Sequence, residues 1–78
     1  MAYMEKQLFE YITIQPNVRF GKPVIIGTRV PVYLIVGKIA GGMTIEEVMR
    51  EYELTREQVQ AALKYAAHLI AEEEIAFA

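Results

Sequence analysis

The sequence predicts an α+β domain that is mainly helical, with a small N-terminal β-hairpin followed by three helices, the last two in a helix-turn-helix arrangement. Three observations support this fold class. Short β-branched runs alternate with turn residues over positions 11–26, an apolar run ends at two glycines at 41–42, and two helix-capping patterns follow over 44–58. The 78 residues are expected to form a single domain, divided into an arm at 1–11, a hairpin at 12–27, a helical unit at 28–72 and a tail at 73–78.

The predicted hairpin rests on strand formers that are separated by turn residues. YITI at 11–14 alternates and is rich in β-branched and aromatic side chains, and QPN at 15–17 is a turn signal. Pro23 restricts its own strand to an edge or to a first position. We therefore expect short strands at 11–14, 18–20 and 23–26, with Gly21 and Lys22 at the hairpin tip.

The first helix is predicted over residues 32–40. Pro31 suits a first helical turn, because it lacks an N–H and its φ is fixed, and Gly41 and Gly42 supply a left-handed stop. Thr28 is a candidate cap, and Gly27 is expected to serve backbone geometry. A strand is the competing interpretation, because VYLIV is heavily β-branched. A helix here would be apolar on all sides, through Val32, Tyr33, Leu34, Ile35, Val36 and Ile39.

Two capping boxes predict the remaining helices. Thr44 is followed three residues later by Glu47, and Thr55 by Gln58. The apolar stripe of the second helix contains Ile45, Val48, Met49 and Tyr52, and that of the third contains Val59, Ala62, Leu63, Ala66, Leu69 and Ile70.

Composition argues against several classes of enzyme. The chain has no Cys, no Asp and a single histidine, His68, so thiolate metal sites and Ser-His-Asp triads lack their residues. His68 is expected to be a solvated surface residue, and the glutamates at 72–74 a hydrated helix end. We expect a non-enzymatic protein without catalytic residues, metal or cofactor.

Hydrophobic residues make up 54% of the chain, which is high for a domain with so little interior, and this favours burial against a second copy in a homodimer. No run is long enough to cross a bilayer and no signal peptide opens the chain, so a soluble cytoplasmic protein is expected.

Charge is unevenly distributed along the chain. The net charge is −2, but residues 1–41 hold five Lys and Arg against two Glu, a net +3, whereas residues 42–78 hold three against eight, a net −5. Contact with a polyanion is therefore expected in the first half or at a local patch.

In a helix-turn-helix protein the second helix of the motif reads bases in the major groove, which here is the helix that begins after Thr55. Its outward stripe contains Arg56, Glu57, Gln60, Lys64 and His68. Arginine suits guanine, glutamine suits adenine, and lysine or threonine suits phosphate. An ordinary solvated helix face would look much the same, and Glu57 would repel phosphate. The candidate DNA-binding residues are Arg19, Lys22, Arg29, Thr55, Arg56, Gln60 and Lys64.

Residues 12–67 resemble the prokaryotic family catalogued as domain of unknown function 433. The most specific segments are GKPVIIGTRVPV, GMTIEEVMREY and LTREQVQAAL. The resemblance implies a helix at 32–40 and a fold similar to winged-helix and homeodomain-like proteins. It also implies an antitoxin of the VapB kind, paired with a PIN-like ribonuclease toxin in a toxin-antitoxin system.

The predicted function is thus an antitoxin-like protein that binds a PIN-like ribonuclease and, as an autorepressor, double-stranded operator DNA. The alternative is a protein-interaction or dimerisation module that keeps the helix-turn-helix fold without binding DNA. Arg29 could contact phosphate or an acidic toxin surface, or could instead bond loop carbonyls. The apolar groups of the two chain ends could pack on the domain, on a dimer mate or in a toxin groove. The candidate dimer or partner interface contains Tyr33, Leu34, Ile35, Ile75 and Phe77.

Overall fold

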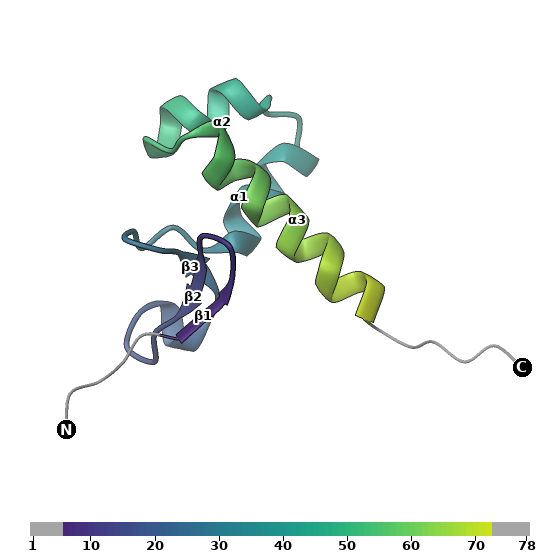
Figure 1. The fold of residues 1–78 in the computed structure, drawn as a ribbon. Coiled ribbons are helices and arrows are strands. Elements are labelled where there is room, and N and C mark those ends of the chain that lie inside the picture. Colours follow the sequence, from purple (N-terminus) through teal and green to yellow (C-terminus); the bar gives the residue numbers. More distant parts are fainter. Residues whose placement is uncertain (1–5, 73–78) are drawn as a thin grey trace, which may run out of the picture.

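The computed structural model describes residues 6–72. It contains a small three-stranded sheet and three helices, which Figure 1 shows with the sheet beneath α3 and with α2 at the end of the helical unit remote from the sheet. The mainly helical α+β class predicted from the sequence is confirmed. The elements are β1 (Lys6–Phe9), β2 (Ile12–Ile14), the 3-10 turn η1 (Arg19–Gly21), β3 (Val24–Ile25), α1 (Val32–Ala40), α2 (Ile45–Tyr52) and α3 (Arg56–Glu72).

The sheet is antiparallel, in the order β1-β2-β3. β1 and β2 form the tight hairpin, which turns at Glu10 and Tyr11, and Tyr11 takes a left-handed φ of 66°. β2 then pairs with β3, with Ile12 opposite Ile25. The expected arm at 1–11 therefore contains a strand of the sheet, and Phe9 packs its ring 5.8 Å from that of Tyr65 on α3.

The strand expected at 18–20 and the hairpin tip expected at Gly21 and Lys22 are wrong. Residues 19–21 form a 3-10 turn instead, because Arg19 and Phe20 both lie in the left-handed region, with φ of 52° and 56°. Such a conformation cannot continue a strand. The turn belongs to a long connection that carries the chain from β2 to β3.

The segment that follows, residues 23–32, closes on itself. Gly27 turns the chain with a φ of +81°, a conformation that glycine adopts without steric cost. The N–H of Ile25 donates to the carbonyl of Val30 (3.0 Å), and the N–H of Val32 donates to the carbonyl of Pro23 (3.0 Å). β3 is thus bonded on one side to β2 and on the other to the residues that lead into α1.

Thr28 stabilises this loop and does not cap the first helix as expected. Its hydroxyl donates to the carbonyl of Ile25 (2.9 Å) and accepts from the N–H of Val30 (3.0 Å). The N-cap position of α1 is held by Pro31, which makes no side-chain cap. The first N–H of α1 is satisfied by Pro23, so the helix start is anchored to the sheet.

The helices begin and end where the sequence predicts. α1 ends at two glycines, of which Gly42 takes the left-handed φ of 113°. Both capping boxes form: Thr44 exchanges hydrogen bonds with Glu47, and Thr55 with Gln58, at 2.8–3.1 Å. Between α2 and α3 the chain turns at Glu53, which has a φ of 54°.

The core lies where α3 crosses α1, α2 and the sheet. The predicted stripe of α2 faces inward, with Val48 fully buried. The apolar stripe predicted for α3 faces the core only in the first half of the helix. Ala61 and Tyr65 are buried in addition, whereas Leu69 and Ile70 are 47% and 69% exposed, because the last turns of α3 extend past the core. The buried apolar residues are Ile12, Val24, Ile25, Val32, Ile35, Val48, Leu54, Val59, Ala61, Ala62 and Tyr65.

Two neighbours on α1 should respond very differently to truncation. Ile35 is completely buried and Tyr33 is 58% exposed. Ile35→Ala should lower the free energy of unfolding by about 2–5 kcal/mol, because it leaves a cavity, and Tyr33→Ala should change it by less than about 0.5 kcal/mol. Urea denaturation followed by circular dichroism measures both variants. Equal losses would mean that Ile35 is not part of the core.

Candidate functional site

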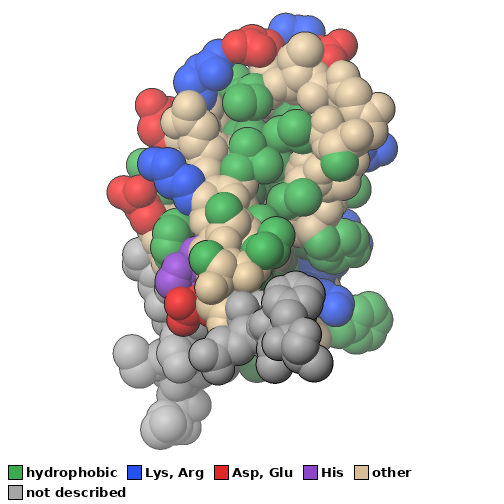
Figure 2. Space-filling view, turned by 90° about the vertical axis from the view of Figure 1, so that its right-hand side faces the viewer, with side chains coloured by type: hydrophobic (Ala, Val, Ile, Leu, Met, Phe, Trp, Pro, Cys, Tyr) green, Lys and Arg blue, Asp and Glu red, His purple; other side chains and the backbone are tan. Residues whose placement is uncertain are grey.

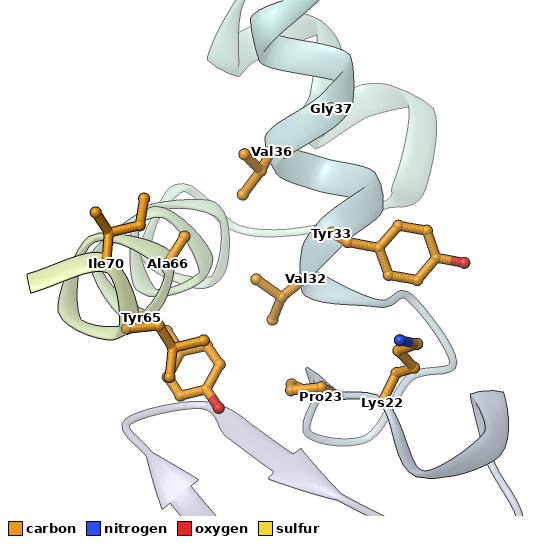
Figure 3. Close-up of a pocket in the computed structure, with 10 residues that line it drawn as sticks. Lys22, Pro23, Val32, Tyr33, Val36, Gly37, Tyr65, Ala66 and Ile70 are labelled. Carbon is orange, nitrogen blue, oxygen red and sulfur yellow. The ribbon is translucent and has the colours of Figure 1, made fainter. Parts of the chain in front are cut away.

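An apolar groove runs between α1 and the last turns of α3, with Pro23, the residue before β3, as its floor (Figure 3). Its volume is about 650 Å³. In Figure 3, Val32 and Val36 point from α1 toward α3, and Tyr65, Ala66 and Ile70 come from the opposite wall. The groove is lined by Lys22, Pro23, Val32, Tyr33, Val36, Gly37, Tyr65, Ala66, Leu69 and Ile70.

The groove exists because α1 and α3 bury only part of their apolar surface against the domain. Val32 and Tyr65 are buried at the bottom of the groove, at 6% and 7% exposure. Tyr33, Leu69 and Ile70 remain open to solvent along its edges. Figure 2 shows hydrophobic side chains gathered along the middle of one face, with charged side chains along its upper and left edges. An exposed apolar surface of this kind is typical of a site that binds another protein.

Chemically the groove suits apolar side chains of a partner polypeptide. Its walls supply aliphatic and aromatic carbon, and of the described residues that line it Lys22 alone is charged. The exposed side chains of Tyr33 and Lys22 give its edge a polar character. Among the described residues that line the groove, no nucleophile is paired with a base.

The predicted interface residues do not all lie on this surface. Tyr33 lines the groove, whereas Leu34 is half-buried and lies outside it. The prediction that Ile35 lies at an interface is wrong, because its side chain points into the core and is completely buried. Ile75 and Phe77 lie outside the described residues.

The predicted DNA-binding residues of α3 form one exposed stripe, but their charges are partly neutralised. Gln60 and Lys64 are exposed, and Thr55 is committed to its capping box. Arg56 forms a hydrogen-bonded ion pair with Glu46 of α2. Over residues 45–64 three positive side chains face five glutamates, so the surface of this helix pair carries net negative charge.

The predicted DNA-binding residues of the first half lie elsewhere, in the loops on either side of β3. Arg19, Lys22 and Arg29 are all exposed. The Nε of Arg19 donates to the carbonyl of Arg29 at 3.2 Å, and among the described residues the Arg29 guanidinium makes no hydrogen bond or ion pair. The arginine that bonds a loop carbonyl is therefore Arg19, and Arg29 presents its charge to solvent. The structure thus separates the seven predicted residues into two groups.

Two carboxyl groups of α2 are stabilised in the charged form. The hydrogen bond from Arg56 lowers the pKa of Glu46, and the backbone N–H of Thr44, followed by its hydroxyl, lowers the pKa of Glu47. Both side chains are exposed, so solvent screens these interactions. Their effect is to keep the first turn of α2 negative to a lower pH than ordinary glutamates would.

Sequence reasoning missed three features of these surfaces. From the sequence, Pro23 is predicted to lie in a strand, and Leu69 and Ile70 in the core. In the structure all three line the groove. Phe20 reads as a strand residue but is 100% exposed. Helix length could have indicated that Leu69 and Ile70 are exposed. α3 has 17 residues and α2 only 8, so the end of α3 must extend beyond its partner. Phe20 had no such signal.

Residues 6–72, the part of the chain that the structure describes, contain neither a membrane-spanning helix nor a cluster of metal ligands. No helix in this part of the chain combines the length and the apolar character that a membrane span requires. Within the same residues no three His, Cys, Asp or Glu side chains lie close enough to share a metal ion.

A pH titration tests the capping carboxylate. Since the folded pKa of Glu47 is depressed, its contribution to stability is fully present above the unfolded pKa of about 4.3 and is lost as the pH falls through the lower folded value. Glu47→Gln can keep the capping bond, as Gln58 does in the second box, without titrating. Thermal melts from pH 7 to pH 3 should show a shallower acid loss for this variant than for wild type, and parallel curves would contradict the assignment.

Comparison with known proteins identifies relatives of the chain. A protein from Sinorhizobium fredii, "Uncharacterized protein y4eO", is 36% identical over 58 residues, which cover 73% of this chain and 26% of that protein. A crystal structure of a DUF433 member protein from Anabaena variabilis superposes with a TM-score of 0.71 at 34% identity, over 74% of this chain and 58% of that one. The crystal structure of Rv2018 from Mycobacterium tuberculosis gives a TM-score of 0.61 at 31% identity, over 67% of this chain and 24% of that one.

The chain thus spans about a quarter of two of these relatives and somewhat more than half of the third. The model of the family "Protein of unknown function (DUF433)" matches residues 12–66, from β2 into the second half of α3. The chain belongs to the DUF433 family.

Proposed function

We propose that the chain is a non-catalytic, antitoxin-like protein that binds a PIN-like ribonuclease, and that the groove between α1 and α3 is the docking surface. The observation that carries the proposal is the groove itself: an open apolar channel whose edge residues Tyr33, Leu69 and Ile70 stay exposed in the single chain. The class of partner comes from the family resemblance of the GKPVIIGTRVPV and GMTIEEVMREY segments. Buried aromatic and aliphatic anchors in such a channel supply most of the affinity of a protein interface.

The homodimer expected from composition would use the same residues. An apolar groove of about 650 Å³ can accept the Ile70 edge of a second copy as well as an apolar element of a ribonuclease. The two occupants then compete, and formation of the complex with the ribonuclease dissociates the homodimer. This competition is part of the proposal, and it can be measured separately.

A variant pair isolates the groove. Ile70→Glu places a charge on the groove wall, and Ala67→Glu makes the same charge change on an exposed position of α3 that does not line the groove. Co-expression of the full chain with the PIN-like ribonuclease encoded beside it, followed by size-exclusion chromatography, should give co-elution for wild type and Ala67→Glu. Ile70→Glu should weaken the complex by about 30-fold or more, because a charge would be buried unpaired.

The outcomes are separable. Absence of a neighbouring PIN-like ribonuclease, or failure of the wild-type chain to co-elute with it, contradicts the antitoxin proposal. Co-elution of Ile70→Glu as strong as that of wild type contradicts the groove as the docking surface. Sedimentation of each variant alone reports on the homodimer, which Ile70→Glu should also weaken.

Operator DNA is a second candidate ligand, favoured by one observation. Two capped helices joined by a three-residue turn place Gln60 and Lys64 on one exposed stripe of α3, as a base-reading helix requires. The acidic residues of α2 oppose this ligand. If α3 binds DNA, Glu46→Gln should strengthen binding, since it removes a negative charge and frees Arg56. No mobility shift with upstream promoter DNA at low salt, for wild type and Glu46→Gln alike, would rule out the autorepressor.

A further inference from the structure

The loop between β2 and β3 exposes an aromatic ring that packs against none of the residues that the structure describes. Phe20 is 100% exposed, and of the large hydrophobic residues that the structure describes as exposed it is the most open. Figure 1 places this part of the chain at the end of the sheet remote from α2. Full exposure of a phenylalanine opposes the hydrophobic effect, so the position is better explained by binding than by folding.

The backbone holds the ring in this position. Arg19 and Phe20 are consecutive residues in the left-handed region, a conformation that most side chains avoid. Hydrogen bonds from Val18 to Gln15, from Gly21 to Val18 and from Lys22 to Arg19, at 3.0–3.1 Å, close the turn. The Arg19 side chain then ties the turn to the neighbouring loop through the carbonyl of Arg29. Phe20 is therefore presented by a fixed scaffold.

The surroundings of the ring are cationic. A hollow of about 340 Å³ lies beside it, lined by Pro16, Asn17, Arg19, Phe20 and Arg29. Between Glu10 and Glu46 the sequence contains four lysine and arginine residues and no acidic residue. The loop thus differs in sign from the α2 surface, and an anionic ligand would meet attraction here without a compensating carboxylate.

We infer that this loop, with Phe20 at its centre, binds single-stranded nucleic acid. An exposed ring can stack on an unpaired base, the guanidiniums of Arg19 and Arg29 can neutralise the flanking phosphates, and the Asn17 amide can hydrogen-bond a base edge. A hollow of this size accommodates about one nucleotide. Paired bases in a duplex are already stacked on one another, so the ring would have no face to contact there.

A protein partner fits the observations less well. Protein interfaces bury a contiguous apolar centre of several residues, whereas the lining residues around Phe20 are proline, asparagine and two arginines. This site is independent of the proposed function, because no residue lines both the groove and the hollow. Lys22, which lines the groove, directly follows the turn that carries Phe20.

Fluorescence anisotropy with the full chain and a labelled single-stranded RNA of mixed sequence tests the inference. At about 50 mM salt the wild type should bind, with a slope of log K against log salt of about −1.4 for the two arginines. Phe20→Ala should weaken binding by about 5- to 150-fold, and Phe20→Leu by a similar factor, whereas Phe20→Trp should retain it. Arg29→Ala should reduce the salt slope by about 0.7. Arg50→Ala on α2 is the control: it removes the same charge as Arg29→Ala from an exposed position that lines neither the groove nor the hollow, and it should behave as wild type.

Each contrary result is decisive, since Phe20 contributes no packing and its variants should melt as wild type does. No binding by wild type at low salt, unchanged binding by Phe20→Ala, or equal binding of a duplex DNA of the same length would overturn the site. Loss of ribonuclease co-elution in Phe20→Ala, with RNA binding unaffected, would assign the ring to a protein interface instead.

Discussion

The closure of residues 23–32 on themselves around Gly27 is the constraint on which the other features depend. The bonds from Ile25 to Val30 and from Val32 to Pro23 join the last strand to the start of the first helix. They satisfy backbone groups that would otherwise be buried without partners. They also set the direction in which α1 leaves the sheet, and hence the angle at which α1 meets α3.

Both candidate binding surfaces are built on this closed segment. Pro23 and Val32, which its bonds hold together, form one end of the apolar groove. Arg29 lies in the same segment, and its carbonyl anchors Arg19 in the neighbouring turn. A small domain can position an apolar site and a cationic site in this way with one rigid element, while its acidic α2 surface stays apart from both. An exposed ion pair such as that of Arg56 and Glu46 contributes little free energy, so this pair alone would not keep Arg56 from a phosphate. What opposes DNA binding at α3 is the net negative charge of residues 45–64, which hold five glutamates and three cations.

The sequence predicted those elements whose signals are local. Thr44, Glu47, Thr55 and Gln58 form their capping boxes because each pair needs only its own backbone, and the double glycine ends α1 for the same reason. Arg19 and Phe20 were misassigned as strand because β propensity assumes an extended backbone, and here backbone hydrogen bonds between residues three apart close a turn with a left-handed one. Periodicity placed Ile70 on the correct side of α3, but it cannot tell where the core stops.

The site residues were harder to predict for a related reason. A stripe of polar residues on α3 is visible in sequence, whereas the ion pair that occupies Arg56 links residues of two different helices. Ile35 and Tyr33 are both apolar and two positions apart, and only the packing of α1 against its neighbours shows that one is core and the other is groove. The class of partner in the proposed function rests on the family resemblance alone, and the groove is the surface proposed for it.

Two glycines offer the most direct measurement of the central constraint. A Cβ would meet no atom within 4 Å at either Gly27 or Gly37, so steric room is equal, but only Gly27 has a positive φ, whereas Gly37 lies within α1. Gly27→Ala should lower the free energy of unfolding by about 1–2 kcal/mol, and Gly37→Ala should raise it by up to about 1 kcal/mol. Chemical denaturation of the two variants beside wild type measures both changes. A Gly27→Ala protein as stable as wild type would show that the left-handed turn does not hold the segment closed.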